Sequence, residues 1–106
     1  MKKVNILGTE YSLIEDSGFL KQINADGIHK EYEKEIAIRS LDDFLCADDK
    51  SEAKELRMKE VLRHELIHAF FSESGLDDYC CNEQLVNWLA IQFPKMLKAF
   101  EEADCL

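Results

Sequence analysis

The sequence predicts an α+β fold in which a small, mostly antiparallel sheet from the N-terminal half packs against a buried central helix and a kinked C-terminal helix. Residues 1–39 contain short apolar runs of strand length between turn residues. Residues 51–72 contain neither Gly nor Pro, and residues 82–100 carry an apolar stripe at helical spacing, interrupted by Pro94. Because the chain has 106 residues, we expect one domain over residues 1–106.

The N-terminal half predicts two pairs of short strands. Gly8-Thr9 separates the first two runs and predicts a hairpin, and a turn at Asp26-Gly27 precedes the other two. A short helical turn is expected between the pairs, near residues 18–24. The last run alternates polar and apolar residues, as does a strand with one buried face. The strands are expected at residues 4–7, 10–15, 28–32 and 35–39.

The C-terminal half predicts two helices joined by a short link. Residues 40–50 hold four aspartates without a helical period and predict a connecting loop. Ser51 is an N-cap candidate for the first helix, and Ser74-Gly75 should end it. The second half of that helix is apolar nearly all round, which predicts a buried position in the middle of the domain. Asn82 is the next N-cap candidate, and its helix should kink or break near Phe93 because Pro94 cannot donate a backbone hydrogen bond. Trp88 and the phenylalanines are expected in the core.

Composition and charge limit the kinds of partner. Apolar residues make up 46% of the chain and charged residues 33%, which is typical of a soluble globular protein. The net charge of -9 predicts repulsion from nucleic-acid phosphates and from anionic membranes, so we expect neither as a direct partner. The N-terminal apolar run is too short for a signal peptide, and no run reaches the length of a membrane helix. We therefore expect a cytoplasmic protein that acts on proteins or peptides.

The four cysteines are Cys46, Cys80, Cys81 and Cys105. An intracellular chain with a normal apolar core does not need disulfide bonds, so we expect reduced thiols. The adjacent pair lacks the two-residue spacer of a zinc knuckle, which argues against a separate cysteine metal site.

The central segment reads His64-Glu65-Leu66-Ile67-His68, a complete H-E-x-x-H motif. On a helix the two histidines lie about 40° apart and one turn above each other, so that both imidazoles can bind one zinc ion. Glu65 is rotated by about 100° from His64 and lies beside the metal without binding it. That is the position of a general base for a metal-activated water. The alternative is two histidines on the surface or with partners in the core.

A catalytic zinc ion usually takes three protein ligands, so a third must come from another segment. Glu83 is the first choice because it opens the next predicted helix. Asn87, one turn further on, would share its face and could accept a hydrogen bond from the distal nitrogen of a ligand histidine. The alternative for Glu83 is an ordinary first-turn acid that complements the helix dipole. The rival ligands are Glu73, Asp77 and Asp78.

An H-E-x-x-H motif followed by a helix bearing Glu-x-x-x-Asn resembles the gluzincins, zinc peptidases with a glutamate as third ligand. The layout over residues 28–100 resembles the small ImmA/IrrE-like metallopeptidases of prophages and mobile elements, although Ile67 stands where that family often has Gly. The resemblance implies a zinc-dependent endopeptidase that cleaves a specific intracellular protein, such as a repressor. It carries over metal ligation to His64, His68 and Glu83, and catalysis to Glu65.

Two functions remain open. The first is a peptidase, in which residues 36–39 form an edge strand that holds an extended substrate and Tyr79 or His29 donates a hydrogen bond to the oxyanion. For both side chains, a loop aromatic and a surface histidine are the ordinary alternatives. The second function is a protein-binding module that keeps zinc for stability. An intact Glu65 favours the peptidase, because a structural site needs no base.

Overall fold

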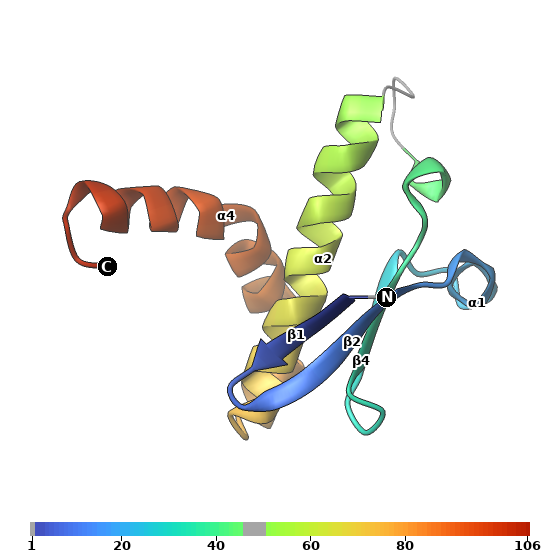
Figure 1. The fold of residues 1–106 in the computed structure, drawn as a ribbon, viewed down its shortest axis with the longest axis horizontal. Helices are drawn as coiled ribbons and strands as arrows, with labels where there is room; N and C mark the ends of the chain where they lie inside the picture. Colours follow the sequence, from blue (N-terminus) through green and yellow to red (C-terminus); the bar gives the residue numbers. More distant parts are fainter. Residues whose placement is uncertain (1, 46–50) are drawn as a thin grey trace.

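The structure is a computed structural model that describes residues 2–45 and 51–106, and it has the α+β class that the sequence predicts. Residues 46–50 of the predicted loop over residues 40–50, Cys46 among them, and the side chain of Ser51 lie outside the described part. Figure 1 shows the sheet on one side of the long helix α2 and the C-terminal helix α4 on another. The elements are β1 (Lys2–Ile6), β2 (Thr9–Glu15), α1 (Ser17–Gln22), β3 (Gly27–Lys30), β4 (Glu35–Ile38), the 3₁₀ helix η1 (Leu41–Asp43), α2 (Ser51–Glu73), α3 (Asp77–Cys80) and α4 (Glu83–Glu102).

The four strands form one sheet in the order β1-β2-β4-β3. The pairs β1–β2 and β3–β4 are antiparallel, whereas β2 and β4 are parallel. The prediction that residues 36–39 form an edge strand is therefore wrong, since β4 lies between two neighbours and β3 is at the edge. The consecutive residues Ile36 and Ala37 are both fully buried. Because consecutive side chains point to opposite faces, both faces of β4 are covered, as is usual for an inner strand.

The first hairpin turns one residue earlier than predicted. Ile6 pairs with Thr9, so the two-residue loop is Leu7-Gly8, and both loop residues have positive φ (50° and 93°). This combination suits a two-residue hairpin because it matches the twist of the strands. The Gly8 N–H also donates to Asn5 Oδ1 at 2.8 Å, which holds the turn.

Helix α2 lies between the sheet and α4 and contacts both. Its buried positions, Val61, Glu65 and Ala69, are spaced four residues apart and face the sheet. Ala69 joins the main core cluster with residues of β1, β2 and β4. The helix is not buried all round, however, because Phe70 on its outward side is 44% exposed. The apolar pattern predicted a central helix correctly, but α4 covers only part of the outward side.

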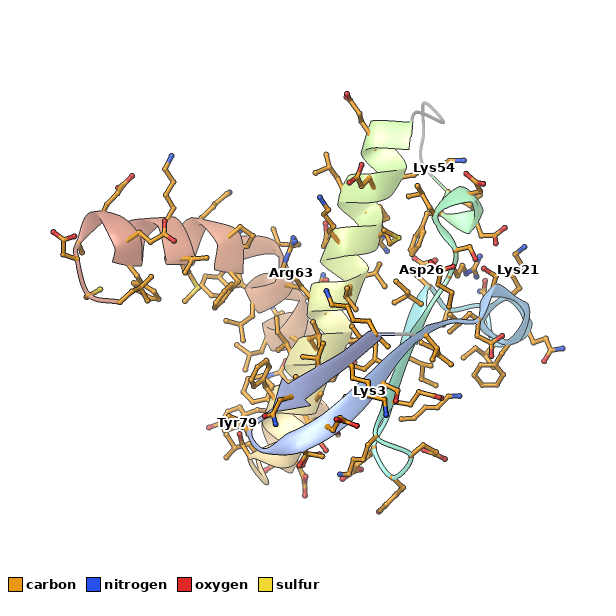
Figure 2. The ribbon with its side chains drawn as sticks, viewed as in Figure 1. Lys3, Lys21, Asp26, Lys54, Arg63 and Tyr79 are labelled. Carbon is orange, nitrogen blue, oxygen red and sulfur yellow. The ribbon has the colours of Figure 1, made fainter. Side chains whose placement is uncertain are left out.

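Helix α4 begins at the predicted cap, where Asn82 Oδ1 accepts a hydrogen bond from the Leu85 N–H at 3.0 Å. Pro94 lies inside a single continuous helix that changes direction along its length, so of the predicted kink or break the break does not occur (Figure 1). Pro94 has no N–H for the carbonyl of Ala90. Arg63 on α2 takes that place, since its Nε donates to Ala90 O at 2.7 Å, and Figure 2 shows it between the two helices. A residue of α2 thus satisfies the carbonyl that Pro94 leaves without a helical partner.

Several large apolar side chains that were expected in the core are on the surface. Trp88, Phe93 and Phe100 of α4 are all exposed, as is Phe70 of α2. The sequence does not show whether another element packs on the apolar face of a helix, because the spacing of the apolar residues is the same in both cases. Among the described residues, no helix combines the length and the apolar character needed to cross a membrane.

Candidate metal centre

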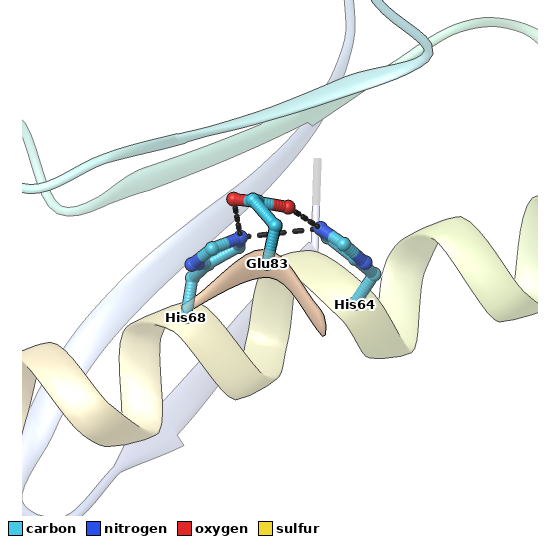
Figure 3. Close-up of side chains that lie close together, drawn as sticks. All are labelled: His64, His68 and Glu83. Atoms are coloured by element: carbon cyan, nitrogen blue, oxygen red, sulfur yellow. Dashed lines mark hydrogen bonds and ion pairs between the residues drawn. The ribbon is translucent and has the colours of Figure 1, made fainter. Parts of the chain in front are cut away.

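Three side chains that the sequence predicted as zinc ligands converge on one point. His64 and His68 project from adjacent turns of α2, and Glu83 is the first residue of α4 (Figure 3). The two histidine Nε2 atoms are 3.1 Å apart, and the Glu83 oxygens lie 3.1 Å from Nε2 of His64 and 3.0 Å from Nε2 of His68. In tetrahedral zinc sites with bonds of about 2.0–2.1 Å, neighbouring ligand atoms are about 3.3 Å apart. The triangle therefore has nearly the size that zinc requires.

His68 has its ring orientation fixed by the backbone. Its Nδ1 donates to the carbonyl oxygen of Cys80 at 2.7 Å, so in the neutral ring Nε2 carries the lone pair that points at the cluster. Burial lowers the pKa of His68 below its ordinary value and favours the neutral form. The sequence predicted Asn87 as the hydrogen-bond partner of a ligand histidine, and this is wrong for His68. The Cys80 carbonyl from α3 takes that place at His68, and within the described residues Asn87 makes no hydrogen bond to either ring.

The three ligand groups lie close enough together to hold one cation. The lone pair of His68 Nε2 faces a carboxylate oxygen of Glu83 and the Nε2 atom of His64, all at 3.0–3.1 Å. A proton on His64 Nε2 can bridge to Glu83 or to His68, but it leaves the contact between His68 and Glu83 as lone pair against lone pair. A divalent cation satisfies all three groups at once, and two imidazoles with one carboxylate form a ligand set that suits zinc. The residues present thus fit a zinc ion.

Glu65 lies beside this triangle and is the one polar residue among the buried residues described, with 7% of its surface exposed. Its Oε2 atom has no hydrogen-bond partner in the described structure. Burial, followed by the nearby charge of Glu83, raises the pKa of Glu65 to about 7. Buried carboxylates without partners are costly and rare, and they are concentrated at functional sites. A base that titrates near neutral pH is well suited to proton transfer.

The raised pKa of Glu65 should make the stability of chelator-treated protein depend on pH. The unfolded chain ionises Glu65 above about pH 4.5, whereas the folded chain keeps the proton until about pH 7. The folded state therefore loses stability as the pH rises between these two values, by up to about 3 kcal/mol, and the effect is constant above them. Glu65→Gln removes the ionisation, so its stability relative to wild type should rise over the same window.

Urea unfolding of both proteins at about pH 5 and about pH 7.5, with chelator present, measures this difference. A stability difference between the two proteins that is the same at both pH values would contradict the assignment. The comparison cancels the titration of the other groups, because both proteins share them.

Gly27 on β3 sets the distance between the edge strand and Glu65. A Cβ atom at this position would lie 2.9 Å from Val61 Cγ1 and 3.0 Å from Glu65 Cγ. Gly27→Ala should therefore destabilise the fold by about 1–3 kcal/mol and displace Glu65. Gly18→Ala is the matched control, since its nearest contact would be 4.0 Å away and Ala favours the helix in which it lies. Urea unfolding measures the stability of both variants. A Gly27→Ala protein as stable as Gly18→Ala would show that β3 and α2 are not in close contact at Gly27.

The other acids considered as third ligand either make hydrogen bonds to other residues or lie outside the cluster. Glu73 accepts hydrogen bonds from Thr9, Tyr11 and Lys34, which hold its pKa down at about 2. Asp77 and Asp78 occupy the first turn of α3 and do not belong to the group that could hold a metal. The sequence offered no means of separating these acids from Glu83, because all four carboxylates follow His68 within fifteen residues.

Of the two residues predicted to donate to the oxyanion, Tyr79 and His29, only His29 lies at a pocket beside the motif. Tyr79 packs its ring 6.0 Å from that of Phe71 and is labelled near the end of α2 in Figure 2, away from the pockets at the motif. His29 does line a pocket with Glu65 and His68. Tyr11, however, donates its proton to Glu73, so the bond between Tyr11 Oη and His29 Nε2 uses the N–H of His29. Burial lowers the pKa of His29, which leaves Nδ1 with a lone pair and no hydrogen to donate.

Two contributors to the site were missed from the sequence. The carbonyl of Cys80 orients His68, and no side-chain pattern signals a backbone acceptor. Gly27 was assigned only to a turn, although a Gly at a strand position signals close approach of another element. Among the described cysteines, Cys80, Cys81 and Cys105 form no disulfide bond with one another. No family model matches the chain, and no similar curated protein or solved structure was found.

Proposed function

We propose that this chain is a zinc-dependent endopeptidase that hydrolyses peptide bonds of a specific intracellular protein. One observation carries the proposal. The ligand atoms of His64, His68 and Glu83 form a triangle of nearly the size that zinc requires, and the buried Glu65 lies on the same helix as the two histidines with an unpartnered oxygen. A structural metal site has no use for such a base, whereas hydrolysis requires one.

The roles of the residues follow from their positions. His64, His68 and Glu83 would hold the zinc ion, and Cys80 O keeps His68 in the tautomer that can bind it. Zinc bound there would supply Lewis-acid chemistry, polarising a peptide carbonyl and lowering the pKa of a water molecule. Glu65 would take a proton from the attacking water and pass it to the leaving amine. Its low-polarity surroundings keep its proton affinity near that required at neutral pH.

The free edge of β3 is the proposed site of substrate binding. Among the described strands β3 pairs with β4 alone, so one row of its backbone groups is available for strand addition by an extended peptide. Two open pockets, of about 200 and 320 Å³, share Gly27 and Glu65 and extend toward His64 and His68 respectively. Alternate side chains of a peptide along β3 would point toward the motif helix and into these pockets.

A zinc-stabilised protein-binding module is the second candidate, and the size of the pockets favours it. Cavities of about 200 and 320 Å³ are at or below the lower end of the range for ligand sites. Such a module would bind zinc in the same way but would cleave nothing. The two candidates therefore differ in whether Glu65 takes part in a hydrolytic reaction.

A search for new protein N-termini in cells separates the candidates. Cells expressing wild type should contain cleavage products that are absent from cells expressing Glu65→Gln at equal abundance. A set of N-termini that is identical in the two would remove the peptidase and leave the binding module.

A further inference from the structure

One face of α4 is covered in its first half and uncovered in its second. Val86 and Ala90 on this face are fully buried, and α2 is the element that α4 contacts most. Continuing at helical spacing, Phe93, Leu97 and Phe100 lie within about 60° of one another on the same face. They are 36–44% exposed, because α4 has bent away from the body of the protein (Figure 1). We call these three residues the arm stripe.

An apolar groove lies at the base of the arm stripe, between α2 and α4. It has a volume of about 550 Å³ and is lined by Leu66, Ile67, Phe70, Phe71, Leu89 and Phe93 beside Arg63. Phe93 belongs to both the groove and the arm stripe, so the two form one continuous apolar surface. Arg63 donates to Ala90 O and is already engaged. Amphipathic helices recognise such grooves through residues at i, i+4 and i+7, which is the spacing of the arm stripe itself.

We propose that this surface binds a second copy of the chain, with the two arms antiparallel across a two-fold axis. A two-fold interface requires one surface that is complementary to itself. This chain supplies both parts: a groove that accepts an apolar helix, and an apolar helix beside it. Each arm would place its stripe against the stripe and groove of the other. The groove shares no residue with the His64, His68 and Glu83 cluster, so the metal site is not required for pairing.

The charges on the arm favour the antiparallel orientation. Lys98 and Glu101 lie on the same flank of the arm stripe, whereas the opposite flank carries the uncharged Gln92 and Ala99. In an antiparallel helix pair like flanks face each other, so Lys98 of each copy meets Glu101 of the other. In a parallel pair each charged flank would face an uncharged one. Neither charge has an ion-pair partner within the described residues of one chain, so both are available.

Analytical ultracentrifugation from micromolar to millimolar concentration tests the dimer. Wild type should dimerise, and Leu97→Asp, which places a charge on an exposed position, should weaken dimerisation at least about tenfold. Circular dichroism and zinc content should stay at wild-type values, because Leu97 is outside the core and the metal cluster. A wild-type chain that stays monomeric, or a dimer that Leu97→Asp does not weaken, overturns the proposal. A monomeric chain that instead binds a synthetic Leu/Lys amphipathic helical peptide assigns the groove to another protein and overturns it too.

Charge reversal tests the orientation. Lys98→Glu and Glu101→Lys should each weaken the dimer several-fold, and the double variant should recover wild-type affinity because it only exchanges the two charges. Lys95→Glu is the matched control, since Lys95 lies on the opposite face of the arm and should have little effect. A double variant that is weaker than both single variants would rule out antiparallel pairing.

Discussion

Glu65→Gln should lower peptide-bond cleavage by a factor on the order of 10² or more while zinc content stays near that of wild type. The substitution keeps the shape of the side chain but removes the carboxylate that takes the proton from water, and general-base catalysis has effects of this size. Zinc is retained because Glu65 is not part of the ligand triangle. The measurement is the initial rate on a substrate identified by its new N-terminus, together with the metal content of the same preparation.

Glu55→Gln is the matched control for this experiment. Glu55 is an exposed acid on the same helix, paired with Lys59 far from the motif, so its loss should leave cleavage unchanged. A Glu65→Gln protein that binds zinc and still cleaves at the wild-type rate would contradict the role of Glu65. A protein that loses both zinc and activity would show that Glu65 helps to hold the metal, which the triangle does not require.

Glu83→Ala should weaken zinc binding at least tenfold, because it removes one of the three ligands and the only negative charge in the triangle. Asp77→Ala and Asp78→Ala are the controls, since both acids lie at the first turn of α3 and outside the cluster. Asn87→Ala should leave zinc affinity close to wild type, because Asn87 bonds to neither histidine. Competition with a chromogenic chelator measures all four affinities. If either aspartate variant loses zinc while Glu83→Ala keeps it, the third ligand is misassigned.

The convergence of the two histidines could be predicted from the sequence because it depends on short-range geometry. His64 and His68 are one helical turn apart, and a helix without Gly or Pro fixes their relative positions before any tertiary contact forms. Glu83 required one more step, a cap at Asn82 that begins the next helix, and this cap is present. The prediction of zinc itself remains a prediction, which the geometry supports.

The features that were predicted incorrectly depend on long-range contacts. Which strand lies at the edge is decided by the parallel pairing of β2 with β4, which joins residues more than twenty positions apart. The partner of His68 is a backbone carbonyl, which any residue at position 80 would supply. Likewise, the arm stripe has the same spacing as the buried part of α4, so the spacing alone does not show which part α2 covers.

The zinc content and zinc position of reconstituted protein test the central claim most directly. After incubation with zinc and removal of the excess, the protein should hold one equivalent per chain, and a crystal should show a single anomalous peak within bonding distance of His64 Nε2, His68 Nε2 and a Glu83 oxygen. Less than about a tenth of an equivalent, or a peak bound by other residues, would contradict the account.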